Sequence, residues 1–349
     1  MNLKELSAHL GLSQTTVSRA LNGYPEVSEA TRSRVLEAAA AHSYTANARA
    51  KALATGRSMA IGHVLPVSTS GEMVNPVFAD FLAGASEVYA RAEYDLMLSV
   101  IDDDDQEHHY RELATKRTVD GLIVHAPRPD DGRIALLQEI GIPFVVHGRA
   151  SALDARYSWV DIENQAAFRR ATDFLLDLGH RRIALLNGRE VYDFAQRRRA
   201  GFEEALTSRG IDPDPSLMIA DEMTERTGHS AVAALLDRPD PPTAILTSSS
   251  ITAFGVRRAA DGLGLVLGRD LSLVTHDDVL SYFRIGDDEP IFTAIRSSVW
   301  DAGRHAAEAL LRQIADPDAC PQIVLPADLV IGASTGPPRT RAIKRAGRA

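Results

Sequence analysis

The sequence predicts an α/β protein in which a small all-α head precedes two doubly wound lobes of parallel β-sheet. Two observations lead to this fold class. The first 57 residues contain short helical segments and nothing that looks like a strand. From Met59 onward, apolar runs of strand length alternate with amphipathic helical stretches, which is typical of parallel sheets wrapped by helices. A chain of 349 residues also exceeds what one core usually holds.

Three short helices account for the head. The leucines of residues 3–10 fall on one helical face, and Gly11-Leu12-Ser13 interrupts the pattern. Ser13 can cap a second helix over residues 14–22, which gives a helix-turn-helix layout. Ser28 begins a third helix. The side of this helix that we expect to be buried contains Val35, Leu36 and Ala39.

The second helix carries polar side chains suited to DNA. Gln14 and Thr15 sit at its N-terminus, where recognition helices meet base edges, and Arg19 follows where it can pair with guanine or phosphate. Val17 and Leu21 should face the core instead. An ordinary capped surface helix has the same features, so the segment after the head matters for the interpretation.

Residues 44–57 form an Ala-rich, basic segment with too few apolar side chains to pack a core of its own. Ala46 and Ala50 permit close approach to another helix or to DNA, and Leu53 offers an apolar wedge for a minor-groove base step. The segment is therefore interpreted as a hinge helix that folds against DNA. A flexible linker with helical bias is the alternative.

Charge is distributed unevenly along the chain, whose net charge is −9. Residues 1–57 hold seven Lys/Arg and four Asp/Glu, whereas residues 337–349 hold five basic and no acidic residues. The remainder is strongly acidic. This segregation suits a head that meets phosphates attached to a body that repels them. Gly336-Pro337-Pro338 marks where we expect ordered structure to end and a basic tail to begin.

The larger part of the chain contains more strand-length runs than one doubly wound unit needs, so two similar lobes are expected. Residues 155–161 look like a passage between them. The clearest runs are Ala60–Leu65, Leu96–Ile101, Gly121–His125, Pro143–His147, Arg182–Asn187, Thr243–Thr247 and Leu271–Thr275.

Over nearly its full length the chain resembles the LacI family of regulators. The similar motifs are Leu3, residues 13–22, Val27-Ser28, Tyr44, Asn47, Ala50, Leu53, Ile61-Gly62, residues 178–184, Arg198, Gly201-Phe202 and Asp277-Asp278. Within the family it looks most like rhizobial-type regulators of alpha-glucoside uptake. Ala46 stands where many members carry proline, a change that still permits a helix start.

The resemblance implies three parts. Residues 1–57 would be a helix-turn-helix DNA-binding domain with its hinge helix at about 45–56. Residues 58–335 would be a periplasmic-binding-protein-like core, with lobe 1 at about 58–156 and 290–318 and lobe 2 at about 157–289 and 319–335. Residues 336–349 would be the basic tail. The expected DNA-binding residues are Ser13, Gln14, Thr15, Thr16, Ser18, Arg19, Asn22, Tyr44, Asn47, Ala50, Lys51 and Leu53.

The same resemblance implies a small molecule held between the lobes. A sugar needs polar groups for its hydroxyls and apolar faces for its C–H patches. Arg198 matches the family's ligand-binding arginine and can fork onto two hydroxyls, whereas Arg197 and Arg199 are expected to be solvated. The expected ligand-binding residues are Asn75, Phe78, His125, His147, Arg149, Arg198, Met223, Ser249, Asp277 and Ser297.

Several of these residues have structural alternatives. Phe78, His125 and Met223 are also consistent with packing, and Asp277 with a helix or turn cap. Departures from the family pattern, Ser249-Ser250 and residues 147–149, bear on the ligand's identity. His147, Arg149 and Arg198 leave open an anionic ligand such as a sugar phosphate, while Asp277 and Phe78 favour a neutral sugar.

No catalytic or metal-binding set emerges. The run Asp102–Asp105 suits a helix start, where the macrodipole explains it. His108-His109 lacks a ligand partner at i+4, and the single Cys320 provides neither a disulfide nor a zinc site. We expect no enzyme activity, no metal and no cofactor.

The expected function follows from these parts. We expect a cytoplasmic homodimer without a membrane partner, because the N-terminus lacks a signal-peptide pattern and no apolar run reaches membrane-spanning length. It would bind a near-palindromic duplex DNA operator and repress a carbohydrate uptake or catabolism operon until its sugar arrives. The sugar would be an alpha-glucoside or another mono- or disaccharide. A corepressor-type regulator that responds to a sugar phosphate or another small anionic metabolite is the alternative.

Overall fold

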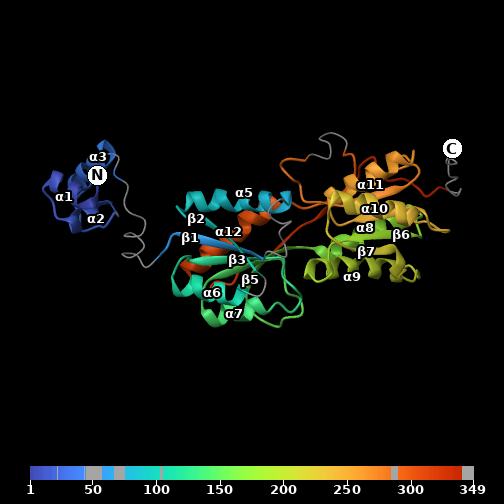
Figure 1. Cartoon of the computed structure of the whole chain (residues 1–349), viewed down its shortest axis with the longest axis horizontal. Helices are drawn as coiled ribbons and strands as arrows, with labels where there is room; N and C mark the ends of the chain where they lie inside the picture. The colour runs from blue at the N-terminus through green and yellow to red at the C-terminus, as the bar shows by residue number, and fades with distance from the viewer. Residues whose placement is uncertain are drawn as a thin grey trace. The chain divides into compact units, whose positions relative to one another are not determined.

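The computed structural model describes residues 1–21, 23–42, 44, 57–66, 75–102, 105–283 and 290–339, and Figure 1 shows their helices and strands. The chain separates into two compact units, Met1–Met59 and Ala60–Ala349. The predicted hinge helix lies outside the described residues, as do residues 340–349 of the predicted tail. Within the described residues, no helix combines the length and apolarity needed to span a membrane.

The first unit contains α1 (Leu3–Leu10), α2 (Gln14–Leu21) and α3 (Glu29–Ala41). Leu36 was expected in its core, but this side chain is 49% exposed. Val35 and Ala39 lie one turn apart and take the inward face of α3, and Leu36 points about 100° away from it. The buried residues that hold the three helices together are Leu6, Val17, Ala20, Val27, Val35 and Ala39.

The second unit contains two sheets, and each sheet with its helices is one lobe. The sheet of lobe 1 has the order β11-β5-β4-β3-β1-β2, with every neighbouring pair parallel. Its strands are β1 (Ala60–Pro66), β2 (Asp95–Ile101), β3 (Gly121–His125), β4 (Phe144–His147), β5 (Ser158–Ile162) and β11 (Gln322–Leu325). Its helices are α5 (Pro76–Arg91), α6 (Gln106–Thr115), α7 (Gly132–Ile140) and α12 (Val299–Ala315).

The sheet of lobe 2 has the order β12-β10-β9-β8-β6-β7, and only the β10–β12 pair is antiparallel. Its strands are β6 (Ile183–Asn187), β7 (Met218–Ala220), β8 (Ala244–Thr247), β9 (Ser272–Asp277), β10 (Thr293–Arg296) and β12 (Asp328–Val330). Its helices are α8 (Asn164–Asp177), α9 (Asp193–Ser208), the 3-10 turn η3 (Pro215–Leu217), α10 (Glu225–Leu236) and α11 (Ser250–Gly262).

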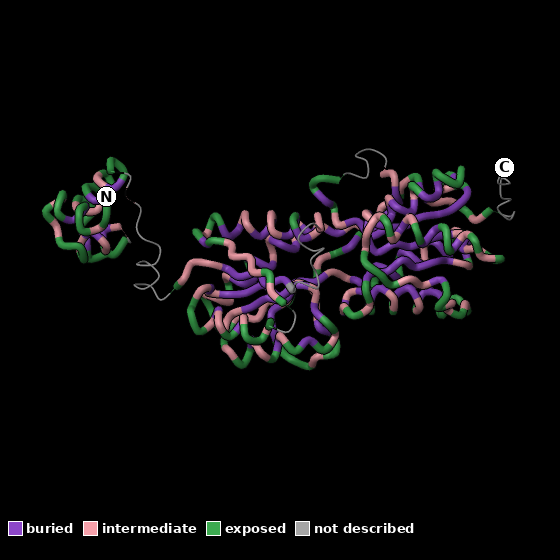
Figure 2. The backbone as a smooth tube through the Cα atoms, in the orientation of Figure 1, coloured by how far each residue is buried: buried purple, intermediate pink, exposed green. Residues whose placement is uncertain are grey.

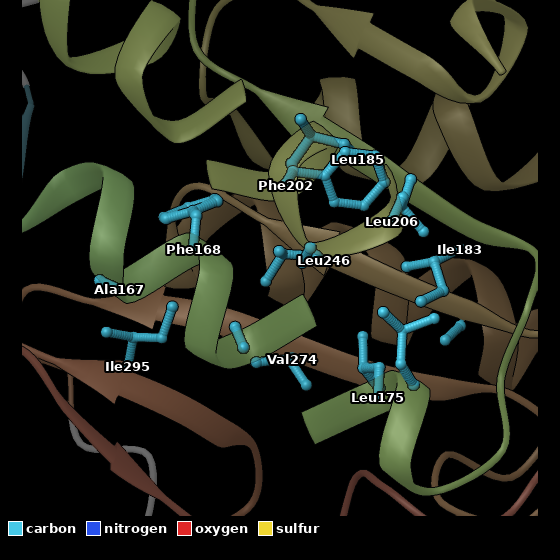
Figure 3. Packing of buried hydrophobic residues seen from close by; sticks show 14 of the residues in the cluster. Ala167, Phe168, Leu175, Ile183, Leu185, Phe202, Leu206, Leu246, Val274 and Ile295 are labelled. Atoms are coloured by element: carbon cyan, nitrogen blue, oxygen red, sulfur yellow. The ribbon is translucent and has the colours of Figure 1, made fainter. Parts of the chain in front are cut away.

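Helices cover both faces of each sheet, so the central strands are buried along their whole length (Figure 2). In lobe 2, Phe168 and Leu175 of α8 and Phe202 of α9 pack on one face of the strands, as Figure 3 shows. Side chains of α10 and α11 form a second core on the other face. This explains the continuous apolar runs that predict the strands, since a strand buried on both faces has no polar alternation.

The chain crosses between the sheets three times, after β5, after β10 and after β11. These crossings differ from the predicted lobe boundaries by a few residues. The predicted passage 155–161 overlaps β5, which pairs with β4 and β11 and therefore belongs to lobe 1. Strand β10, expected in lobe 1, pairs with β9 in lobe 2, and β11, expected in lobe 2, pairs with β5 in lobe 1. Polar residues interrupt or end β5 and β10, Ser158 and Asp161 in the first and Arg296 in the second, so neither shows the continuous apolar run that predicted the other strands.

Candidate functional site

Helix α2 presents its polar side chains to solvent. Gln14, Thr15 and Arg19 are exposed, whereas Val17 and Ala20 are buried against the other two helices. The helical period produces this division, because residues 17 and 20 share one face of the helix. The exposed face therefore has the residues that the sequence assigns to DNA contact.

A side-chain cap fixes the start of α2. The Ser13 hydroxyl accepts the backbone N–H of Thr16 at 3.0 Å, and the two hydroxyls lie 2.8 Å apart. The cap leaves other N–H groups and the positive end of the helix dipole at this exposed end, where phosphates bind favourably. Thr16 and Ser18 are partly exposed, and Tyr44 packs partly buried against the core of the head. Asn22, Asn47, Ala50, Lys51 and Leu53 lie outside the described residues.

A cavity of about 1050 Å³ lies between the two lobes of the second unit. Its walls come from the carboxyl ends of parallel strands, which is where open α/β sheets bind ligands. His125 ends β3 and His147 ends β4 in lobe 1, while Ser248 follows β8 and Ser297 follows β10. Because both lobes contribute, any ligand that fills the cavity contacts both.

Arg198 lies at the lobe 2 wall of this cavity, on α9. Its Nε donates to Asn164 Oδ1 and its Nη1 to the Ser248 carbonyl, both at 2.8 Å. The guanidinium also lies 5.0 Å from the ring centroids of Phe168 and Phe194, one on the core side and one lining the cavity. Burial lowers the pKa of Arg198 to about 10, so the side chain stays cationic at neutral pH.

A glycine sets the distance between α9 and α8. A Cβ atom at Gly201 would lie 2.1 Å from the Gln165 carbonyl oxygen, so no larger residue fits here. This close contact of the helices brings Arg198, one turn before Gly201, to Asn164 at the start of α8. Gly201 therefore allows the helix contact that positions Arg198 at the cavity.

Of the neighbouring aspartates Asp277 and Asp278, it is Asp278 that lines the cavity. His276 and Asp278 line the cavity, whereas Asp277 accepts hydrogen bonds from Arg296 Nε and the Val279 N–H, both at 3.1 Å. Side chains alternate along a strand, so His276 and Asp278 point to the side opposite Asp277. Burial opposes ionisation of Asp278, but its interactions with His276, Arg198 and His147, which include a hydrogen bond from His276, outweigh burial and lower its pKa.

Aromatic rings form the facing wall in lobe 1. His147 stacks on Phe81 with ring centroids 4.3 Å apart, and His125 meets Phe81 and Phe78 edge-on at 5.0 and 5.1 Å. Burial lowers the pKa of His147 to about 4 and holds that of His125 well below its ordinary value. These two histidines are thus uncharged at neutral pH, and the rings present their faces and edges to the cavity.

Behind this wall, His63 fixes the orientation of His125. The His63 Nδ1 atom lies 3.0 Å from His125 Nε2, and its Nε2 lies 3.2 Å from the Tyr89 hydroxyl. Burial lowers the pKa of His63 to about 3. In the described part of the chain, no group of histidine, cysteine and carboxylate side chains is arranged to hold a metal ion.

The structure brings most of the predicted ligand residues to the cavity. Those that line it are Asn75, Phe78, His125, His147, Arg198, Met223 and Ser297. Arg149, Ser249 and Asp277 do not line it. Arg149 donates to Asp161 at 2.7 Å and lies over the Trp159 ring, and Ser249 caps α11 by accepting the Ile251 N–H at 3.2 Å.

Other cavity residues were missed by the sequence interpretation. Among them are Asn164, Tyr192, Phe194, Ser248, His276 and Asp278. Strand alternation around Asp277 is the one signal that identifies two of them. The Ser297 hydroxyl and His276 Nε2 are buried without a hydrogen-bond partner among the described residues, whereas His276 Nδ1 lies 3.4 Å from Asp278 Oδ1. A ligand with several hydroxyls would satisfy these groups, whose burial without partners costs free energy.

Buried ion pairs connect the lobes beside the cavity. Arg197 was expected to be solvated but is 9% exposed, and it contacts Asp193 at 2.5 Å and Asp161 of lobe 1 at 2.8 Å. Asp193 also accepts the Ser151 N–H at 3.0 Å, and its own N–H donates to the Pro127 carbonyl at 2.9 Å. Its neighbour Arg199 pairs with Glu190 and Glu203 and is partly exposed.

Comparison with known proteins supports both parts of this description. Residues 2–47 match the lacI family of bacterial regulatory proteins, and residues 172–335 match the periplasmic binding protein-like domain. The chain is 42% identical to the HTH-type transcriptional regulator AglR of Rhizobium meliloti, over 97% of this chain and 95% of the relative.

Two solved structures are similar in fold. The complex of the transcriptional regulator CelR with cellobiose has a TM-score of 0.69 at 26% identity, over 96% of this chain and 99% of that one. The Lac repressor dimer bound to operator and an anti-inducer has a TM-score of 0.83 at 24% identity, with the same coverage. The helix-turn-helix head and the core of two parallel-sheet lobes are therefore those of known regulators.

Proposed function

Since the chain belongs to the lacI family of bacterial regulatory proteins, we propose that it represses a carbohydrate uptake or catabolism operon and leaves its operator when a sugar binds. Members of this family are DNA-binding transcription regulators and not enzymes. The periplasmic-binding-protein-like core is the sensing part, and the head is the DNA-binding part.

Polar groups on one side of the cavity and aromatic rings on the other support the proposed sugar response. Arg198 and Asp278 supply a donor and an acceptor from one wall, and the aromatic residues of lobe 1 supply apolar faces from the other. Sugars require this mixture, because their hydroxyls need partners and their ring C–H patches need apolar contact. The related CelR structure contains cellobiose, a disaccharide.

A neutral sugar is favoured over a sugar phosphate. The carboxylate of Asp278 faces the same space as Arg198 and would repel an anionic group held by that arginine. We propose an alpha-glucoside or another mono- or disaccharide as the ligand. Arg128 and Arg189 line the cavity from opposite lobes and favour the alternative, a corepressor-type response to a sugar phosphate or similar anion.

Sugar binding would change operator affinity by changing the relative positions of the two lobes. We propose a homodimer on a near-palindromic operator, with one α2 helix per half-site and hinge helices at about 45–56. Sugar binding would draw the lobes together, change their packing across the dimer and separate the hinge helices. Typical coupling of about 1–3 kcal/mol changes operator affinity roughly 5–150-fold.

A labelled-operator titration tests this function. Genomic fragments bound by the purified protein supply the operator, and fluorescence anisotropy then measures its affinity with each sugar of a panel. A neutral sugar should weaken binding in the wild type and not in Arg198→Ala. The control Arg199→Ala removes the neighbouring, partly exposed arginine and should respond normally. Tighter operator binding with glucose 6-phosphate, and no effect of neutral sugars, would favour the corepressor alternative.

A further inference from the structure

We propose that the cavity contains two sugar subsites in series, so that the effector is a linear oligosaccharide of at least two units; this rests on the proposed sugar response. The inner subsite is formed by Arg198, Asn164, Ser248, His276, Asp278 and Ser297. The outer subsite is formed by Tyr192, Phe194 and Met223. Tyr192 is the residue that we assign to length specificity.

The cavity is larger than one sugar ring needs. A single pyranose displaces roughly the volume of six waters, or ~180 Å³ at ~30 Å³ per water. The cavity of about 1050 Å³ exceeds this several times and lies at the upper end of small-molecule sites, which span ~300–1,000 Å³. A monosaccharide in the inner subsite would leave most of the cavity to solvent.

The outer subsite has the surface that a second sugar ring needs. The rings of Tyr192 and Phe194 are nearly parallel, 10° apart, with centroids separated by 6.1 Å. At Gly188, just after β6, an added Cβ would lie 3.1 Å from the Phe194 ring and 3.3 Å from Met223 Sδ, so these side chains converge there. Together they form a continuous apolar surface along the lobe 2 wall.

This surface lines the cavity and lies outside the two apolar cores of lobe 2. Tyr192 and Phe194 are only partly buried, and neither they nor Met223 belong to the apolar cores of lobe 2. A core role would place these rings among the side chains of α8–α11. Aromatic rings that line a cavity instead are suited to stacking on the C–H face of a sugar.

Phe194 joins the two subsites. Its ring lies 5.0 Å from the Arg198 guanidinium on one side and beside Tyr192 on the other. A sugar unit held by Arg198 would therefore place its linked neighbour against Tyr192. Because Phe194 also supports Arg198, a Phe194 variant would affect both subsites, and Tyr192 is the cleaner position for a test.

The experiment is calorimetric titration of the full-length protein with sugars of increasing length. Glucose, maltose and maltotriose form a series of increasing length. Isomaltose and cellobiose change the linkage, and melibiose, compared with galactose, changes the sugar. For the series that binds, we expect the disaccharide to bind about tenfold more tightly than its monosaccharide. Tyr192→Ala should remove most of that gain, with a much smaller loss of monosaccharide affinity, while Tyr192→Phe should retain the gain.

Val191→Ala is the matched control, since Val191 is the exposed neighbour of Tyr192 and does not line the cavity. It should bind both sugars like the wild type. Equal affinity of the wild type for the mono- and disaccharide, or an equal loss of both in Tyr192→Ala, would overturn the two-subsite proposal and leave the sugar response intact. Failure of every sugar to bind or to change operator affinity would instead overturn the proposed function as well.

Discussion

The Arg197 guanidinium and the Asp161 carboxylate lie 2.8 Å apart, and they come from different lobes. Arg197 extends from α9 in lobe 2, and Asp161 lies on β5 in lobe 1, next to a crossing of the chain. Both side chains are buried, and both have a second partner, Asp193 for Arg197 and Arg149 for Asp161. The relative position of the lobes therefore depends on charges that are shielded from water.

Arg197→Met should destabilise the core strongly. The substitution keeps much of the side-chain volume and leaves Asp161 and Asp193 buried with one cationic partner fewer, which typically costs about 3–5 kcal/mol. Urea unfolding of the wild type and the variant measures the change. Arg169→Met is the control, because its ion pairs with Glu204 and Asp173 are exposed and should be worth about 1 kcal/mol or less. Similar losses in both variants would contradict a structural role for the lobe-connecting pair.

Gly201→Ala should weaken both folding and sugar binding. The added Cβ meets the Gln165 carbonyl, so α8 and α9 must separate, at a typical cost of about 1–3 kcal/mol for overpacking. The same shift moves Arg198 away from Asn164. Gly262→Ala, at the end of α11 with no atom within 4 Å of the new Cβ, should be neutral or slightly stabilising. Urea unfolding and sugar titration measure both effects, and unchanged sugar affinity in Gly201→Ala would show that the helix contact does not position Arg198.

Strands that are buried on both faces could be predicted from the sequence, whereas short strands that are placed by pairing could not. The long apolar runs, such as Gly121–His125, predict strands within two residues of those observed, because burial on both faces leaves a strong signal. Short strands such as β7 and β12 carry no such signal, and β5 was interpreted as a passage. Their place follows from pairing with distant strands, which one sequence does not display.

The same distinction applies to the site. Arg198 and Ser297 were expected at the ligand site from the family resemblance, and both line the cavity. Asp277 was expected at the cavity, but its neighbour Asp278 lies there. Which of two adjacent residues faces the cavity depends on the alternation of side chains along the strand, and a shift of one residue reverses it. Arg197 was expected in solvent because a charged residue usually is exposed. Its partners Asp161 and Asp193 come from elsewhere in the chain and become visible only in the fold.

The stability of the core should fall as pH decreases from about 6.5 toward 4. Burial holds the pKa of His63 at about 3 and that of His147 at about 4, whereas an unfolded histidine titrates near its ordinary value of 6.5. Between these values the unfolded chain binds more protons than the folded one. Each such histidine lowers the free energy of unfolding by up to ~1.4 kcal/mol per pH unit. Above pH 6.5 the contribution is fully present.

Urea unfolding at pH 7, 6 and 5 measures this slope. His63→Gln should make the slope shallower by removing one of the buried groups that titrate, although it also lowers stability at pH 7 by breaking the contacts with His125 and Tyr89. His108→Gln alters an exposed histidine on α6 and should leave the slope as in the wild type. An unchanged slope in His63→Gln would contradict the neutral, buried state of this side chain.

Arg19→Ala should weaken operator binding and leave the fold of the head intact. Arg19 is exposed on α2, and its side chain is not part of the apolar core that holds the three helices together. If it reads a base, specific affinity should fall by about 1–3 kcal/mol; if it contacts phosphate, affinity should fall for all duplexes and the salt slope should decrease by about one. Arg34→Ala removes the same charge from the exposed side of α3 and is the control. Equal effects of the two would indicate a general charge effect.

If the cavity and the DNA-binding head share a single equilibrium, sugar and operator must weaken each other's binding by the same factor. Sugar affinity is determined by calorimetry with and without saturating operator, and operator affinity by anisotropy with and without saturating sugar, in the same buffer. Linkage requires the two affinity ratios to agree, and we expect both to show weakening of roughly 5–150-fold. Sugar binding of the same affinity on free and operator-bound protein would contradict the account.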